Sequence, residues 1–132
     1  MTVAVDASVL VAGLVDGGSE GRWAESIIAG GSIVAPELAL VETSNILRRL
    51  ERIEDISPLE ATSAHRDLTR LDMELFPFSP VASRIWALRR NLTSYDAWYV
   101  AVAEALDCPL ATLDQKLSRA SGTTCRFMTP RG

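Results

Sequence analysis

The sequence predicts an α/β fold, a three-layer sandwich in which helices flank a mostly parallel central sheet. Its 132 residues suit one domain, spanning 1–132, with a single hydrophobic core. Short apolar segments alternate with longer segments of helical periodicity, the pattern expected of parallel strands joined by helices. There is no linker, internal repeat or low-complexity tract, and a hydrophobic content of 48% is that of a globular chain.

The first third predicts the order strand, helix, helix, strand. Alternating valines mark the first strand, and Ser19 is expected to cap the second helix, whose apolar positions recur at helical spacing. Pro36 stops the second strand. The expected elements are a strand at 2–6 ("TVAVD"), a helix at 7–16 ("ASVLVAGLVD"), a helix from 20 to Gly30-Gly31, and a strand at 32–36 ("SIVAP").

The rest of the chain continues the alternation. Ser57, Pro58 and Glu60 form a capping-box signature that starts a helix, and a second Ser-Pro pair at 79–80 predicts another start. The segment "YDAWYVAVAEAL" (95–106) is a helix built to be buried, capped by Thr93 or Ser94. The expected elements are helices at 37–53, 57–71, 79–91, 95–106 and 115–120, an edge strand at 74–78, and strands at 108–114 and 124–130.

Four acids are expected to meet at one edge of this sheet. In open α/β sheets, sites form in the crevice beyond the carboxyl ends of the strands. Asp6 and Asp114 end predicted strands there. Asp96 begins a helix that follows another helix, so its place at the same edge is an inference. Glu42 lies on the border between the apolar face and the polar stripe of the 37–53 helix, where a carboxylate is half-buried.

Each acid also has a simpler interpretation when taken alone. Asp6 could cap the next helix, Glu42 could pair with Arg49, Asp96 could complement its helix dipole, and Asp114 could be a turn residue. These interpretations account for single residues. They do not account for four acids gathered at one end of a sheet.

Four neighbouring carboxylates repel one another and have raised pKa values unless a cation offsets their charge. Oxygen ligands without His or Cys suit Mg²⁺ or Mn²⁺, and Mg²⁺ keeps coordination positions open for water and phosphate oxygens. The lone His65 is expected on an exposed helix face rather than at a site. The chain has no G-x-G-x-x-G, P-loop or G-x-S-x-G motif, which argues against dinucleotide binding, NTP hydrolysis and serine-hydrolase chemistry.

Bulk properties set further bounds. The net charge of −4 argues weakly against general nucleic-acid binding, but if four of the 17 acids serve a metal, 13 remain against 13 Lys and Arg. Cys108 and Cys125 are too few for a disulfide framework or a zinc site, and are expected to be small buried side chains in a reduced, cytoplasmic protein. No apolar stretch approaches the ~20 residues of a membrane span, and no signal peptide is recognisable.

Four blocks together resemble a known family. They are "VAVDASVL", "LVETSNILRR", "LTSYDAWYVAVAEAL" and the closely following "PLATLD". From Thr2 to Pro130 the chain is similar to a PIN domain, specifically a VapC-type toxin of bacterial toxin–antitoxin pairs. None of the acids of that family is missing. The matching positions are Asp6, Glu42, Asp96 and Asp114 for the acids, Ser8 and Thr112 for two hydroxyl residues, and Asn45 for a polar residue three after the glutamate.

The resemblance implies a PIN-like fold and a Mg²⁺- or Mn²⁺-dependent endoribonuclease that cuts single-stranded or loop RNA. It also implies a homodimer and a small VapB-like antitoxin whose C-terminal segment covers the acidic cleft. The segment 55–90 is the least constrained by the motifs, so the choice of RNA stays open.

A mechanism follows as a hypothesis. Asp6 and Asp96 hold the principal metal, Asp114 completes its coordination or helps to hold a second ion, and Glu42 orients or deprotonates the attacking water. The two hydroxyl residues, Ser8 and Thr112, hold carboxylates or waters in place. The metal lowers the pKa of its water, so hydroxide attacks in line and leaves a 5′-phosphate and a 3′-hydroxyl.

Residues that contact RNA are harder to predict. Tyr95 lies beside Asp96 and could stack on a base, whereas Trp86 and Trp98 are expected in the core. The basic runs 47–52 and 88–90 are equally well explained as solvated helix faces. The RNA-contact candidates are Arg49, Tyr95, Lys116 and Arg119, with Arg126 near the same strand.

Other classes of function fit the sequence less well. A non-catalytic RNA- or protein-binding module on the same fold is the main alternative, and the complete set of acids argues against it. A phosphotransfer receiver domain needs an early acid pair and a lysine at the end of a late strand, but this chain has "VDAS" and "TLD" at those places. A phosphatase whose motif begins D-x-D is also disfavoured, because Ser8 stands where the second aspartate would be.

Overall fold

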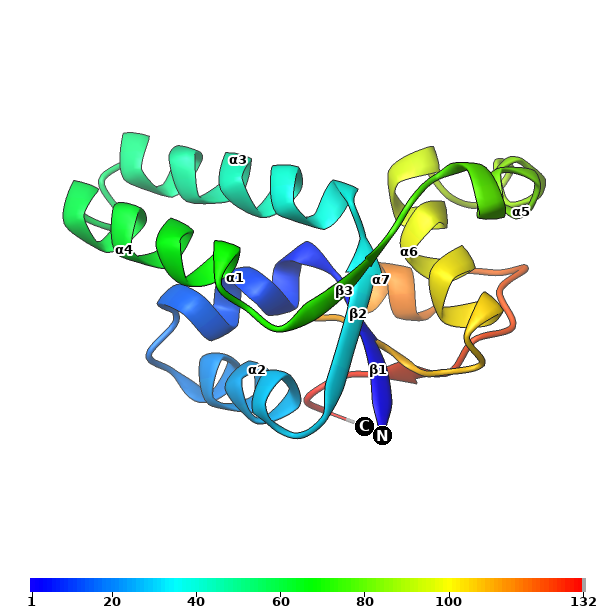
Figure 1. Ribbon diagram of the computed structural model, residues 1–132, viewed down its shortest axis with the longest axis horizontal. Helices are drawn as coiled ribbons and strands as arrows, with labels where there is room; N and C mark the ends of the chain where they lie inside the picture. The colour runs from blue at the N-terminus through cyan, green and yellow to red at the C-terminus, as the bar shows by residue number, and fades with distance from the viewer. Residues whose placement is uncertain (132) are drawn as a thin grey trace.

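The computed structural model describes residues 1–131, which form a five-stranded sheet with helices on both sides (Figure 1). The strand order is β3-β2-β1-β4-β5, and every neighbouring pair is parallel, so the expected mostly parallel sheet is entirely parallel. The strands are β1 (Thr2–Val5), β2 (Ser32–Pro36), β3 (Met73–Phe76), β4 (Leu110–Ala111) and β5 (Phe127–Met128).

The helices connect these strands in the predicted alternation. They are α1 (Ala7–Val15), α2 (Ser19–Ala29), α3 (Leu38–Arg52), α4 (Pro58–Thr69), α5 (Ala82–Ala87), α6 (Ser94–Ala105) and α7 (Gln115–Ser118), with a 3₁₀ turn, η1 (Ser79–Val81), before α5. None of the helices in residues 1–131 combines the length and apolar character that a membrane crossing requires.

The central strand β1 determines where the site forms. It lies between β2 and β4, with Ala4 paired to Val34 on one side and to Leu110 on the other. Val3, Ala4 and Val5 are buried, as expected of a strand covered on both faces. Because all strands run in the same direction, their carboxyl ends meet at one edge, which is where Asp6 begins α1.

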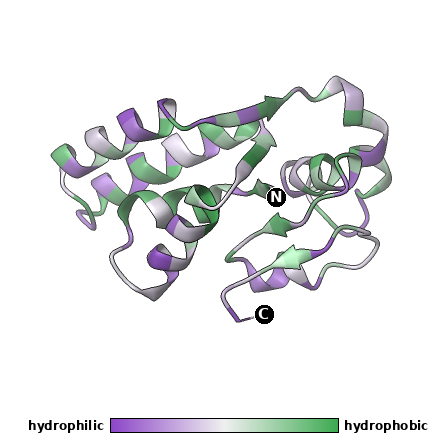
Figure 2. Ribbon diagram, turned by 60° about the horizontal axis from the view of Figure 1, so that its bottom comes forward, coloured by the Kyte–Doolittle hydropathy of each residue, from purple (hydrophilic) through white to green (hydrophobic). Residues whose placement is uncertain are grey.

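The helices form two groups on either side of the sheet. In Figure 1, α1 to α4 lie on the left and α5 and α6 on the right. Helix α1 packs against α2, α3 and α4, whereas α6 packs against β1, β2 and β4 and against α5. Figure 2 shows the strands mostly in the colour of hydrophobic residues, while the longer helices carry hydrophilic and hydrophobic residues in turn, as amphipathic surface helices do.

Helix α6 is the buried helix that its composition predicts. Its core-facing positions are mostly small or β-branched, which lets the helix backbone approach the sheet closely. Thr93 caps it by accepting a hydrogen bond from the Asp96 amide, 3.1 Å away. The buried residues of α6 are Ala97, Tyr99, Val100, Ala101, Val102 and Ala103.

Several predicted boundaries need correction. The Ser57 capping box is present as predicted, with the Glu60 amide donating to Ser57 and the Ser57 amide donating to Glu60. The second Ser-Pro pair, at 79–80, instead opens the 3₁₀ turn, and α5 ends at Ala87 rather than at residue 91. At α2, Ser19 is the first helical residue and the cap position is Gly18, which has no side chain to offer.

The last two strands are shorter than predicted, at two residues each, and the prediction for Trp86 was wrong. Trp86 is 65% exposed, whereas Ile85 and Leu88, three residues apart and therefore on one helix face, are buried. Its ring is covered by the Arg89 guanidinium, 4.5 Å from the ring centroid. Trp98 does pack against the core, with its ring edge-on to Phe78.

Candidate metal centre

Asp6 lies at the carboxyl end of β1, buried, with 6% of its surface exposed. It is the N-cap of α1, so the capping interpretation is also correct: its Oδ1 accepts a hydrogen bond from the Val9 amide at 3.2 Å. The Ser8 hydroxyl donates to the same oxygen, and the Thr112 hydroxyl donates to Oδ2. Both carboxylate oxygens are therefore fixed in orientation.

The two hydroxyls are themselves held by the chain that leads to Asp114. The Leu113 amide donates to Ser8 Oγ at 3.0 Å, and the Asp114 amide donates to Thr112 Oγ1 at 3.0 Å. Thr112 is fully buried. These hydrogen bonds connect the end of β1 to the segment after β4, so Asp6 and Asp114 belong to one hydrogen-bond network.

Burial raises the pKa of Asp6 from 3.8 to about 6, although the hydrogen bonds from Ser8, Thr112 and Val9 act in the opposite direction. The donors thus offset only part of the cost of placing a carboxylate in this position. A cation beside Asp6 would offset the remainder.

Asp96 stands in the first turn of α6 and is half-buried. Burial raises its pKa, and the negative charges of Asp114 and Glu42 raise it further. Within residues 1–131 its carboxylate receives no hydrogen bond from the protein, whereas those of Asp6, Glu42 and Asp114 each receive at least one. Asp96 is therefore the acid of the group with the least compensation from the protein itself.

Asp114 is exposed and follows β4 by three residues, so it is not the last residue of that strand, contrary to the prediction. It is the N-cap of α7, where its Oδ1 accepts from the amides of Lys116 and Leu117 at 2.9 and 3.1 Å. These bonds hold one carboxylate oxygen. Oδ2 accepts none within the described residues, so it is free for another ligand.

Glu42 is half-buried on α3, as predicted from its place between two helix faces. Within the part of the chain that the structure describes it forms no ion pair with Arg49. Instead, its Oε1 accepts a hydrogen bond at 2.6 Å from the hydroxyl of Tyr99 on α6. Sequence reasoning missed Tyr99, although it follows Asp96 by three residues and so shares a face of the helix with it.

Tyr99 also shows how close the acids are to one another. Burial raises the pKa of its phenol well above the ordinary value, and the hydrogen bond to Glu42 and the charges of Glu42, Asp6 and Asp96 add to the effect. The phenol therefore stays protonated and acts as a donor. The acids at the end of β1, on α3, on α6 and before α7 thus lie close enough for their charges to act on one another.

The donor set fits a hard divalent cation. It consists of carboxylates with hydroxyls behind them, and it includes no imidazole or thiol. Among residues 1–131 no three such groups already stand in position to share one ion. Like charges without a counter-ion repel, and the protein donors hold Asp6 and Asp114 by the oxygens described above. Binding of an ion therefore requires side-chain adjustment, chiefly of Asp96, whose carboxylate accepts no hydrogen bond within residues 1–131.

The other predicted residues lie outside this network. Tyr95 is 62% exposed beside Asp96. His65 is exposed on α4, as expected. Cys108 is buried and Cys125 partly buried; both are free thiols, and burial raises the pKa of each. The remaining candidates, Asn45, Arg49, Lys116, Arg119 and Arg126, are all exposed, and within residues 1–131 none of their side chains forms a hydrogen bond to the acids.

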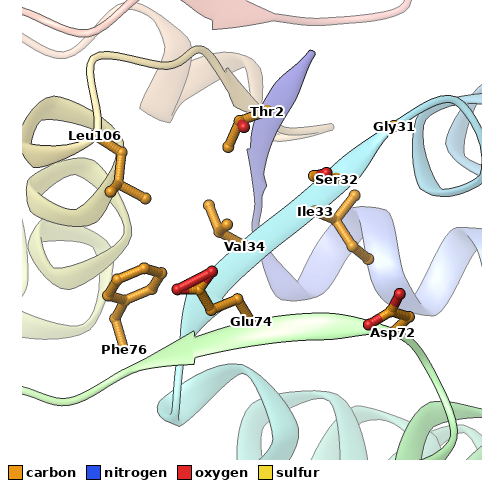
Figure 3. A pocket seen from close by; sticks show the side chains of 9 residues that line it. All are labelled: Thr2, Gly31, Ser32, Ile33, Val34, Asp72, Glu74, Phe76 and Leu106. Atoms are coloured by element: carbon orange, nitrogen blue, oxygen red, sulfur yellow. The ribbon is translucent and has the colours of Figure 1, made fainter.

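A separate hollow of about 370 Å³ lies over the open half of the sheet (Figure 3). Thr2 and Ser32, at the amino ends of β1 and β2, line one end of it, and Glu74 and Phe76 of β3 point into it. It contains none of the four acids. Since Asp6 and Asp114 stand at the carboxyl edge, this hollow is not part of the candidate centre.

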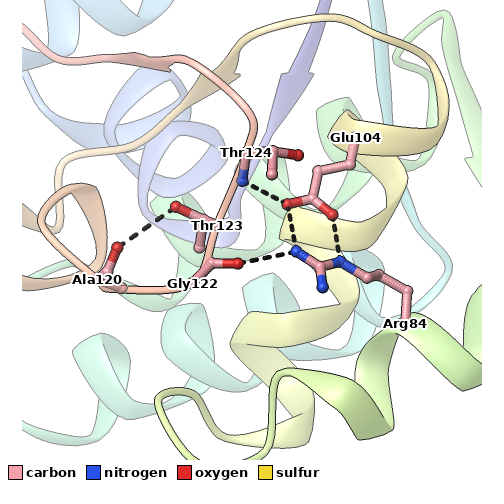
Figure 4. A network of polar contacts seen from close by, with 6 residues as sticks. All are labelled: Arg84, Glu104, Ala120, Gly122, Thr123 and Thr124. Carbon is pink, nitrogen blue, oxygen red and sulfur yellow. Dashed lines mark hydrogen bonds and ion pairs between the residues drawn. The ribbon is translucent and has the colours of Figure 1, made fainter.

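A second polar network supports the fold rather than the site (Figure 4). Arg84 of α5 forms a bidentate ion pair with Glu104 of α6, with nitrogen–oxygen distances of 2.6 and 3.1 Å. Arg84 also donates to the Gly122 carbonyl, and Glu104 accepts from the Thr124 amide at 2.7 Å. The network fixes the segment between α7 and β5 against α5 and α6.

Comparison with known proteins accords with this geometry. The PIN-domain family model matches residues 3–122. The chain belongs to the PIN-domain family. Ribonuclease VapC9 of Mycobacterium tuberculosis is 36% identical over 123 residues, which cover 93% of this chain and 94% of that protein. At this level of similarity this chain is a VapC-type ribonuclease.

Solved structures agree on the fold. The crystal structure of M. tuberculosis VapC20, described as a toxin that cleaves the sarcin-ricin loop, superposes with a TM-score of 0.67 at 18% identity and covers 92% of this chain and 96% of that one. VapBC2 from Rickettsia felis, bound to a DNA fragment from its promoter, gives 0.68 at 14% identity and 98% coverage of both chains. At these identities the likeness shows the PIN fold alone.

Proposed function

We propose that this VapC-type PIN domain acts as the toxin of a toxin–antitoxin pair, as a Mg²⁺- or Mn²⁺-dependent endoribonuclease whose centre is Asp6, Glu42, Asp96 and Asp114. One observation carries the proposal. The charges of Asp114 and Glu42 raise the pKa of Asp96, burial raises that of Asp6, and the protein's own donors do not fully compensate either carboxylate. A divalent cation would supply that compensation.

When bound, the ion would neutralise the phosphodiester and lower the pKa of a water molecule. Asp6 and Asp96 are the residues to hold it, with Oδ2 of Asp114 as a further ligand. Ser8 and Thr112 keep the Asp6 carboxylate in one orientation. Glu42 orients the attacking water and accepts its proton. The water attacks the phosphorus without help from the ribose 2′-hydroxyl, and the bond to the 3′-oxygen breaks. The departing oxygen takes up a proton, so the products carry a 5′-phosphate and a 3′-hydroxyl.

The RNA strand needs positive charge near these acids. Arg119 lines a polar hollow of about 510 Å³ with Ser118, Thr129 and Arg131, and α7 connects it directly to Asp114. No acid lines this hollow, and within residues 1–131 neither arginine forms an ion pair. Phosphates next to the cut site would bind here, with Lys116 nearby and Tyr95 stacking on a base at the opposite rim. Asn45 and Arg49 of α3 are proposed at the same rim.

A small antitoxin would cover the cleft, as the relation to VapBC proteins suggests. An apolar groove of about 490 Å³ runs from the cleft between α1, α3 and the start of α4. It begins at Ser8 and Leu113, beside Asp6, and suits the apolar face of a peptide helix or strand. Its other apolar lining residues are Val11, Ala12, Val15, Ile46, Leu50 and Ile56, and the acids Asp16, Asp55 and Glu60 also line it. A homodimer and a cytoplasmic location complete the proposal.

The test is cleavage of total cellular RNA by the purified protein with Mg²⁺, with Mn²⁺ or with EDTA. Asp96→Asn is the informative variant, and Asp72→Asn, an acid outside the cleft, is the matched control. We expect discrete fragments with 5′-phosphates that need the metal, persist in the control and disappear in Asp96→Asn. Equal behaviour of wild type and Asp96→Asn in every metal would refute the proposal. RNA binding without cleavage would then favour a non-catalytic binding module.

A further inference from the structure

Tyr99 occupies an unusual position between the core and the acidic cleft. Only 2% of its surface is exposed, and its ring is part of the main hydrophobic core. At the far end of that ring, the hydroxyl donates to Glu42 Oε1 at 2.6 Å. A phenol anchored by its ring in a packed core is a rigid donor, because few side-chain torsions remain free.

The bond joins the two groups of helices across the cleft. Glu42 belongs to α3, which packs on α1 and α4, whereas Tyr99 belongs to α6, which packs on the sheet and on α5. Within residues 1–131 the Glu42 carboxylate accepts no other hydrogen bond. A glutamate has three side-chain torsions, and a half-buried one without a partner samples several orientations. The orientation of Glu42 is therefore determined largely by Tyr99.

We propose that Tyr99 is a positioning residue: its hydroxyl holds Glu42 by Oε1 and so leaves Oε2 available to the metal and its water. The inference rests on the proposed function, and adds to it a residue that the four-acid pattern does not contain. One face of α6 then presents both a metal ligand, Asp96, and the group that orients the acid on the opposite wall. Residues that orient ligands in this way typically change metal affinity or activity about 10- to 100-fold when removed.

Tyr99→Phe tests this with the smallest possible change, because the ring stays in the core and only the hydroxyl is lost. Thr43→Val is the matched control: it removes another fully buried hydroxyl, next to Glu42, whose oxygen has no hydrogen-bond partner among residues 1–131. Circular dichroism and thermal melts check that both variants fold. The readouts are Mn²⁺ affinity by calorimetry in the absence of RNA, and kcat and KM for RNA cleavage.

We expect Tyr99→Phe to weaken Mn²⁺ binding about 10-fold and to lower kcat at least as much, with KM changed less than about 2-fold. Thr43→Val should match wild type in both measurements. In a Glu42→Ala background, Tyr99→Phe should change Mn²⁺ affinity less than about 2-fold, because its partner is already gone.

Two outcomes would overturn the inference while leaving the proposed function intact: Tyr99→Phe binds Mn²⁺ and cleaves RNA like wild type, or its effect is equally large with and without Glu42. The second result would mean that Tyr99 acts through the core rather than through the glutamate. If the wild type itself neither binds Mn²⁺ nor cleaves RNA, the proposed function and this inference fail together.

Discussion

Replacing Asp6 by Asn should make the metal-free protein more stable while abolishing cleavage. Burial raises the pKa of Asp6 from 3.8 to about 6, so the folded state holds this proton more tightly than the unfolded state does. The stability of the wild type therefore falls as the pH rises from about 4 to about 6, and the cost is fully present above about pH 6. At 1.36 kcal/mol per pKa unit, that cost is about 3 kcal/mol.

Asparagine removes the charge but not the whole hydrogen-bonding pattern. Its amide oxygen still accepts from the Val9 amide and from Ser8, whereas its NH₂ group must face Thr112, whose hydroxyl now has to accept rather than donate. Thr112 Oγ1 already accepts from the Asp114 amide, so this exchange costs about 1 kcal/mol. We therefore expect a net gain of about 2 kcal/mol, or roughly 7 °C in Tm for a chain of this length.

Urea denaturation in EDTA measures this effect at about pH 7.5 and again at about pH 4. The variant should be the more stable protein at the higher pH, and the advantage should vanish at the lower one, where wild-type Asp6 is protonated. Excess Mn²⁺ should then stabilise the wild type far more than the variant. The reasoning fails if Asp6→Asn is equally destabilising at both pH values, since the donors around Asp6 would then fully compensate its charge.

Three further outcomes are expected. Ser8→Ala should weaken Mn²⁺ binding about 10- to 100-fold in calorimetry without preventing folding, because one donor to Asp6 is lost; unchanged affinity would show that Ser8 does not hold the ligand. Glu104→Gln should lower the free energy of unfolding in urea by about 1–2 kcal/mol, yet leave kcat in saturating metal unchanged, since its ion pair with Arg84 supports the fold away from the acids; a large fall in kcat would contradict this separation. Arg119→Ala should reduce the slope of log affinity against log salt concentration by about 1 for an RNA that is not cleaved, because one phosphate contact is lost. The loss of affinity should be similar for RNAs of different sequence. An unchanged slope would show that Arg119 is not part of the RNA interface.

The regular part of the fold could be predicted from local rules. Alternating valines predicted β1, the short apolar run before Pro36 predicted β2, and the Ser57–Glu60 pair predicted the start of α4. All three signals depend on residues close together in the chain. The place of Asp6 at the carboxyl edge of the sheet could also be predicted, since parallel strands end at a common edge. The resemblance to the PIN-domain family, which the four sequence blocks carry, is confirmed by the match over residues 3–122.

What could not be predicted depends on packing between distant segments. In the sequence, Tyr99 cannot be told from the other core residues of an apolar helix. Only the fold brings its hydroxyl to Glu42, which is 57 positions away. Trp86 is exposed because the face of this segment that packs on the core is the one that carries Ile85 and Leu88, and the residue type alone does not reveal that face. Asp114 lies beyond the end of β4 because the pairing with β5 closes after two residues, so the acid serves as a helix cap.

The most direct test of the account is a crystal structure of the protein grown with Mn²⁺, with an anomalous difference map to locate the ion. We predict a peak in the cleft within about 2.2 Å of carboxylate oxygens of Asp6 and Asp96, the distance expected of a hard divalent cation with oxygen ligands. Asp114 or Glu42 should lie in its coordination sphere, directly or through water. An empty cleft at a Mn²⁺ concentration that supports RNA cleavage, or an ion bound elsewhere, would contradict the claim that these four acids form the metal centre.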